Sequence, residues 1–154
     1  MSYFLFFSAH FDRDKGLDMG RLSLNHIYNG TVNIWLASSS VSGKQYPESF
    51  HRRGGFLPPQ YRTSNVKTYS VKTQPIDLNS TRGVRGNFYQ ILPFQIFTDK
   101  GGVRSDFGIH KDADAPGSLG CIVMSADRFK EFEAEMFILL QKNTTSVPLF
   151  VQYS

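Results

Sequence analysis

Hydrophobic and polar residues alternate most regularly within residues 21–37. Two runs with a period of two residues flank the dipeptide Asn29-Gly30, and their alternating positions are Leu22, Leu24 and His26, then Val32, Ile34 and Leu36. A period of two is typical of a strand that buries one face. Asn-Gly is preferred in tight hairpin turns because both positions tolerate positive φ. The pattern therefore predicts a β-hairpin over residues 21–37.

Shorter apolar runs predict further strands along the chain. Residues 3–7 and 147–153 are apolar runs that predict a first and a last strand. Residues 61–76 predict one or two edge-like strands. Residues 88–97 are apolar and aromatic but contain Pro93. Because proline cannot donate to a sheet ladder, this stretch predicts an edge strand or a bulged one.

Residues 125–142 have the spacing of an amphipathic helix, the only helix that we expect. Ser125 can cap its start, and Asp127 suits its first turn. Its apolar positions recur every three or four residues, at Phe129, Phe132, Met136, Leu139 and Leu140.

Residues 38–59 are rich in Ser, Gly and Pro and predict a long loop. Residues 12–20 and 79–86 predict shorter loops. Long loops within compact domains are often functional. We expect residues 38–60 to wall a substrate cleft opposite residues 117–121, with Gly54-Gly55 as a mobile stretch. The alternative is an unstructured surface excursion.

Composition favours one mainly β domain over residues 1–154. The chain has 14 Phe and 7 Tyr, which suit pleated surfaces. Its net charge of +4 comes from scattered basic residues, so we expect no nucleic-acid partner. No apolar stretch reaches the length of a membrane span, and we expect no signal peptide in the first nine residues. No cluster has metal-ligand spacing, so we expect no metal and no cofactor.

The only cysteine, Cys121, follows a histidine at position 110. Residues 106–110 and 121–124 predict strands, and the turn formers between them predict a hairpin that places His110 roughly 5 Å from Cys121. A neighbouring imidazole can take the proton of a thiol and make it a nucleophile. Backbone N–H groups of Leu119, Gly120 and Cys121 could bind an oxyanion. By spacing alone, an inert buried cysteine is the alternative.

Gly108-Ile109-His110, followed by Gly117-Ser118-Leu119-Gly120-Cys121-Ile122, resembles the signature of the L,D-transpeptidase (YkuD-type) catalytic domain family. In that family a histidine on one strand precedes a Ser/Thr-x-Gly-Cys turn. The resemblance extends loosely over a large part of the chain and closely over residues 104–124. Leu119 and Val123 differ, because the family usually has His and then Arg or Asn at these positions.

The resemblance implies a β-sandwich or barrel domain with one amphipathic helix after the catalytic cysteine. It implies that Cys121 attacks an L,D peptide bond of a peptidoglycan stem peptide, with His110 as general base. Water would then give carboxypeptidase or endopeptidase activity, and an amine would give a cross-link. In this family a backbone carbonyl often orients the histidine. Action on the bacterial cell wall, in the periplasm or envelope, would require a phage-encoded origin or another delivery route.

Secondary candidates surround this pair. Ser118 could hydrogen-bond near the thiolate or only stabilise the local turn. Arg104 could hold a substrate carboxylate or be a solvated strand-end charge. Asp112 could steer His110, bind a substrate amine or be plain surface, and Leu119 would contact the substrate. Two other functions stay open: an inactive wall-binding or virion-associated module with the same fold, and a thiol amidase on another substrate. The sequence does not indicate the oligomeric state.

Overall fold

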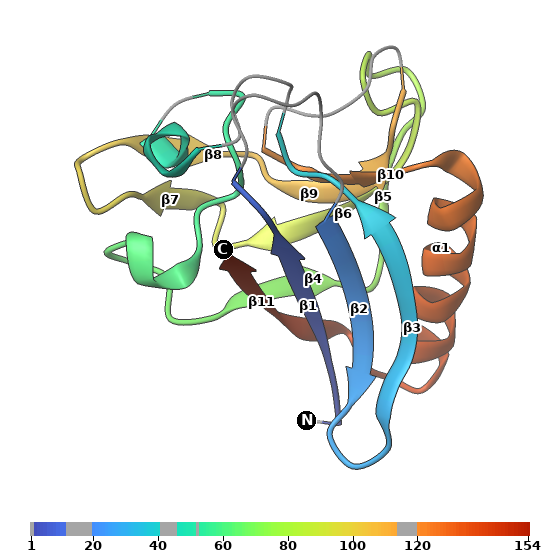
Figure 1. The fold of residues 1–154 in the computed structure, drawn as a ribbon. Helices are drawn as coiled ribbons and strands as arrows, with labels where there is room; N and C mark the ends of the chain where they lie inside the picture. Colours follow the sequence, from blue (N-terminus) through green and yellow to red (C-terminus); the bar gives the residue numbers. More distant parts are fainter. Residues whose placement is uncertain (1, 12–19, 41–45, 52, 114–119) are drawn as a thin grey trace.

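The computed structural model describes residues 2–11, 20–40, 46–51, 53–113 and 120–154 (Figure 1). The described chain is mainly β, as predicted, with a nine-stranded mixed sheet, a separate two-stranded sheet and one α-helix. The strands of the large sheet are β1 (Tyr3–Ala9), β2 (Gly20–His26), β3 (Gly30–Ala37), β4 (Tyr69–Lys72), β5 (Ile76–Leu78), β6 (Gly86–Leu92), β9 (Gly108–Lys111), β10 (Ile122–Met124) and β11 (Ser146–Tyr153). The remaining elements are β7 (Gln95–Phe97), β8 (Val103–Ser105), α1 (Ala126–Gln141) and the short 3-10 helices η1 (Pro47–His51) and η2 (Gln60–Arg62).

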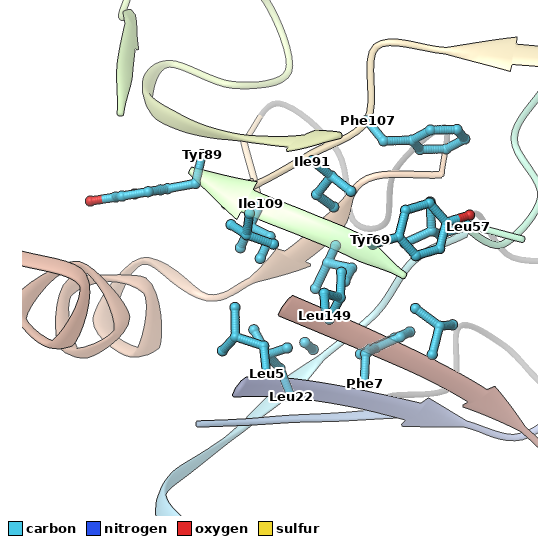
Figure 2. Packing of buried hydrophobic residues seen from close by; sticks show 14 of the residues in the cluster. Leu5, Phe7, Leu22, Leu57, Tyr69, Tyr89, Ile91, Phe107, Ile109 and Leu149 are labelled. Atoms are coloured by element: carbon cyan, nitrogen blue, oxygen red, sulfur yellow. The ribbon is translucent and has the colours of Figure 1, made fainter. Parts of the chain in front are cut away.

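The large sheet runs in the order β10-β9-β6-β4-β11-β1-β2-β3, and β5 pairs with β6. Side chains alternate across it, so one face of each strand enters a common core. Figure 2 shows Leu5, Leu22, Leu149 and Ile109 within this core, although they come from distant parts of the sequence. Each such fully buried side chain contributes about 1.5–3 kcal/mol relative to an exposed one.

The β2–β3 hairpin confirms the prediction for residues 21–37, but its turn differs from the predicted one. His26 pairs with Gly30, so residues 27–29 form the turn, and the register shifts between Leu24 and Asn25. Gly30 has φ 79°, whereas Asn29 is not among the residues with positive φ. The longer loop needs only one left-handed residue, which the glycine supplies.

The two ends of the strand order meet beside α1. Ser38, directly after β3, exchanges two backbone hydrogen bonds of 2.8 Å with Val123 of β10, so the sheet curls back on itself. The predicted helix is confirmed as α1, with Ser125 as its N-cap. Its Phe132 packs edge-on against Trp35 of β3 at 5.5 Å and against Tyr89 of β6 at 5.2 Å. Figure 1 shows α1 beside β3.

Two strand predictions were wrong, and so was the alternative considered for residues 38–59. β6 lies between β9 and β4 rather than at an edge, because it ends at Leu92 and Pro93 falls outside the ladder. β4 is likewise internal, between β6 and β11. The described part of residues 38–59 is not a surface excursion, since it contains η1 and the buried run 54–59. The predicted loop 12–20 lies outside the described residues, except for Gly20.

Candidate functional site

The strands that carry His110 and Cys121 are neighbours, but they run parallel and do not form the predicted hairpin. Ile109 pairs with Ile122, and His110 pairs with Val123. Val123 also pairs on its other side with Ser38, so the direction of β10 is set by β3 as well as by β9. Cys121, directly before β10, therefore lies level with the start of β9, two residues before His110.

His110 and Cys121 share the face of the sheet that points away from the main core. Ile109, Ile122 and Met124 enter that core, so the alternate residues His110 and Val123 point the other way. Cys121 stands two residues before Val123 and falls on the same side. Diagonal neighbours of this kind have Cα atoms about 7–8 Å apart, within reach of long side chains. Among the described residues, no hydrogen bond joins the thiol to the imidazole.

The imidazole of His110 is held as a neutral base. It is buried and stacks on the Phe88 ring at 5.9 Å. Nδ1 lies 2.8 Å from the Lys111 carbonyl oxygen, which can only accept, so Nδ1 carries the proton. Burial lowers the pKa of His110 below its ordinary 6.5, and the hydrogen bond to Lys111 opposes this shift. The lone pair is therefore on Nε2, the nitrogen that could receive a proton from a thiol.

The surroundings of Cys121 favour the protonated thiol at neutral pH. Sγ lies 3.7 Å from the Asp106 carbonyl oxygen, and the side chain is partly buried. Burial raises the pKa of Cys121 to about 11, although a backbone hydrogen bond from Gly108 and the charge of Arg104 act in the opposite direction. The charge of Asp106 adds to the increase. The site therefore holds a thiol beside a separate base, and not a preformed thiolate.

Arg104 is a buried cation next to Gly120, so its interpretation as a solvated strand-end charge was wrong. Its Nη1 donates to the carbonyls of Phe50 at 3.2 Å and Phe56 at 2.6 Å, and Nη2 donates to Gly55 at 3.0 Å. The guanidinium also lies over the Phe107 ring at 4.8 Å. Burial lowers the pKa of Arg104 to about 10, which leaves it charged at neutral pH. Its contact with a substrate carboxylate stays a prediction.

The same contacts fix Gly54-Gly55, which was expected to be mobile. Both residues are buried, and a Cβ on Gly55 would lie 2.1 Å from the Ser49 carbonyl oxygen. The run that they begin is thus packed and hydrogen-bonded from below by Arg104. The mobility expected of Gly54-Gly55 is therefore not supported by their packing.

Gly120 places the cysteine in a turn that only glycine fits. Its φ is 113°, and a Cβ would lie 2.4 Å from both Arg104 Nη2 and the Phe107 ring. Its carbonyl accepts a hydrogen bond of 2.8 Å from Ser39 Oγ, which in turn accepts one of 2.9 Å from the Leu57 N–H. Sequence reasoning missed Ser39, because its run of serines resembled ordinary loop composition and only the fold brings it to Gly120.

Within its described residues, the structure does not bring the other residues predicted from the sequence to Cys121 and His110. Ser118 and Leu119 lie outside the described residues. The Asp112 N–H donates to the Met124 carbonyl at 2.7 Å, so Asp112 lies at the far end of the strand pair, about 10 Å along β10 from Cys121. Sequence reasoning did not select Asp106, the acid whose backbone meets the thiol.

Two hollows of about 310 and 330 Å³ lie near the start of β4 and on the outer face of β1 and β2, and their described lining includes neither His110 nor Cys121. No group of three or more His, Cys, Asp or Glu residues in the described chain could hold a metal ion. The described helix is too short and too polar to span a membrane.

No known protein-family model matches the chain, and no curated protein sequence matches it. The function must therefore be argued from the geometry around Cys121 and from the motif that surrounds it.

Proposed function

We propose that the protein is an L,D-transpeptidase-like cysteine enzyme that acts at an L,D peptide bond of peptidoglycan stem peptides, by acyl transfer or hydrolysis. One observation carries the catalytic part: Cys121 shares a sheet face with His110, whose Nδ1–H bond to Lys111 leaves Nε2 free of a proton. The substrate class, the bacterial wall as the place of action and the finer assignment to an L,D-transpeptidase-like β-sandwich or barrel rest on the resemblance of residues 104–124. We propose no nucleic-acid or membrane partner.

Because burial raises the pKa of the thiol, we expect the thiol proton to be removed as the sulfur attacks. As Sγ attacks the carbonyl carbon, the C–S bond forms and Nε2 of His110 accepts the thiol proton. The oxyanion would be bound by N–H groups of the turn that contains Gly120. Collapse breaks the C–N bond, and the leaving amine takes the proton from His110. Water or a second amine then attacks the thioester while His110 accepts its proton. The C–S bond breaks, the acyl product leaves, and the Cys121 sulfur regains the proton from His110.

The present separation of the two side chains does not exclude this chemistry. Catalytic hydrogen bonds are often long in unliganded sites and shorten when the substrate binds. The Phe88 ring covers Gly108 on this face, since a Cβ on Gly108 would meet the ring at 2.1 Å. A substrate carbonyl that reaches both groups across Gly108 would therefore have to displace this ring.

A second candidate is an inactive wall-binding or virion-associated module. The observations that favour it are the thiol pKa of about 11 and the lack of a described hydrogen bond between Cys121 and His110. Such a module would retain the fold and its affinity for the wall without turnover.

Incubation with purified peptidoglycan, followed by mass analysis of the soluble products, tests these functions together. We expect the wild type to release a D-amino acid or to form new cross-links, and Cys121→Ala to do neither. Sedimentation of both proteins with the wall, without products, would support the binding module. Turnover of other amides but not of stem peptides would support a thiol amidase.

A further inference from the structure

Asp106 lies against the thiol in an uncommon backbone conformation. It precedes β9 and has φ 65°, a left-handed conformation that Asp and Asn adopt more readily than other non-glycine residues. This conformation accompanies the approach of its carbonyl oxygen to Cys121 Sγ at 3.7 Å. The side chain is exposed, and Oδ2 accepts a hydrogen bond of 3.1 Å from Ser105 Oγ. Within the described residues the carboxylate forms no ion pair.

The two charged groups that act on the thiol, Arg104 and Asp106, differ in their exposure to a ligand. Arg104 is 7% exposed, and its guanidinium donates to the carbonyls of Phe50, Gly55 and Phe56. Asp106, two residues later, presents its carboxylate to solvent. Of these two charged groups, only the carboxylate of Asp106 is open to a ligand from solvent, although the protein has a net charge of +4.

His110 contributes a second polar group to the face that carries Cys121. It is 6% exposed, and its only described hydrogen bond uses Nδ1, so Nε2 has no described partner on the face that it shares with Cys121. Asp112, the acid considered from the sequence as an amine-binding residue, lies beyond the opposite end of β9. Asp106 is thus the better placed acid.

We propose that Asp106 binds a cationic group of the substrate, an ammonium close to the scissile bond, and so selects amine-bearing peptides. This inference rests on the proposed function and names the substrate charge that the site prefers. It has a consequence for reactivity. The carboxylate of Asp106 disfavours the thiolate, and a bound ammonium offsets that charge, so a cationic substrate makes its own nucleophile easier to deprotonate.

Charge-selective labelling of Cys121 tests the local preference without any peptide turnover. The probes are two methanethiosulfonates, one with a trimethylammonioethyl group and one with a sulfonatoethyl group. Each forms a disulfide with the thiolate and expels methanesulfinate. Because both react with the same thiolate, the ratio of their rates cancels changes in the thiolate fraction and reports the local charge.

We expect Asp106→Asn to lower the ratio of cationic to anionic labelling rates by about tenfold at low salt. Asparagine also tolerates the left-handed backbone, and the melting temperature checks the fold. Asp106→Glu should retain most of the ratio, which a purely structural role would not require. Glu131→Gln, an equal charge change on the exposed face of α1, should leave the ratio within about twofold. An unchanged ratio in Asp106→Asn, or a larger decrease in Asp112→Asn, would overturn the assignment.

Two stem peptides that differ only in a free or an acetylated amine connect this preference to turnover. We expect kcat/KM to favour the free amine, and Asp106→Asn to reduce that preference by about tenfold. Equal kcat/KM for both peptides would refute the inference and leave the proposed function standing. If neither peptide is turned over but the labelling ratio falls as expected, the proposed function fails and the cation preference of Asp106 stands.

Discussion

The β2–β3 hairpin and the β9–β10 pair both join two strands by a short connection, but different contacts hold them. In the hairpin, a three-residue turn links antiparallel strands, and inward side chains such as Leu22 and Trp35 enter the core. In the parallel pair, residues distant in the sequence hold the start of β10. Ser38 forms a β-bridge with Val123, and Ser39 Oγ donates a hydrogen bond to the Gly120 carbonyl.

Because of this difference, substitutions in the two regions should have different effects on stability and on turnover. The hairpin depends on a local pattern of alternating residues and one glycine, so most single changes in it should affect stability alone. The parallel pair positions a nucleophile and a base through distant contacts, so changes there should alter turnover, stability or both. Matched substitutions in the two regions test whether they differ in this way.

The largest difference should come from the two histidines. We expect Cys121→Ala and His110→Ala each to lower turnover of stem peptides by at least about 10³-fold, and the double variant to be little worse, because a nucleophile and its base act as a unit. His26→Ala in β2 is the matched control. His26 Nδ1 only accepts N–H bonds from Tyr28 and Asn29 in the turn, so turnover should persist. Equal losses in both histidine variants would remove the distinction.

The two arginines should differ next. Arg104→Met leaves three buried carbonyls without their donor, so we expect the free energy of unfolding to fall by about 3–5 kcal/mol. Arg21→Met in β2 removes an exposed cation and should cost less than about 0.5 kcal/mol. Urea unfolding measures both. A loss below about 1 kcal/mol for Arg104→Met would show that its hydrogen bonds do not fix residues 50–56.

Two left-handed glycines allow a narrower test. Gly30→Ala adds a side chain in open space and should cost about 1 kcal/mol for its backbone conformation alone. Gly120→Ala also forces a Cβ against Arg104 and Phe107, so we expect about 2 kcal/mol more. Thermal melts of the two variants give the difference. If they are equally destabilised, the turn before Cys121 is looser than the contacts indicate.

The smallest expected effect is a shift in pH dependence. Neutral His110 is the base, so activity is lost as pH falls through its pKa, which burial places below 6.5. We therefore expect the acid limb of kcat/KM to lie below pH 6.5. Phe88→Ala removes the stacked ring and admits water, so it should move that limb upward. An acid limb well above pH 6.5 in the wild type would argue against buried His110 as the base.

Much of the fold could be predicted from the sequence because its signals are local. Alternation at Leu22 and Leu24 gave the hairpin, and the spacing of Phe129 and Phe132 gave α1. The parallel pairing could not be predicted, because a short connection between two strands favours a hairpin and no local signal shows that β10 also pairs with Ser38.

The site could be predicted only in part, for the same reason. The motif predicted Cys121, His110 and Gly120 as site residues. In the fold, His110 lies in β9, and Gly120 and Cys121 directly precede the neighbouring strand β10. The roles of Arg104 and Ser39 depend on carbonyl groups and turns more than 40 residues away in the sequence. Burial of a charge or hydroxyl cannot be read from its neighbours along the chain.

The most direct test of the central claim is the intact mass of the protein after rapid acid quenching with a stem peptide. We expect a covalent adduct equal in mass to the peptide without its terminal D-amino acid, mapped by proteolysis to Cys121. The adduct should be absent in Cys121→Ala and should form far more slowly in His110→Ala. Release of the D-amino acid by Cys121→Ala at the wild-type rate, without any adduct, would contradict the account.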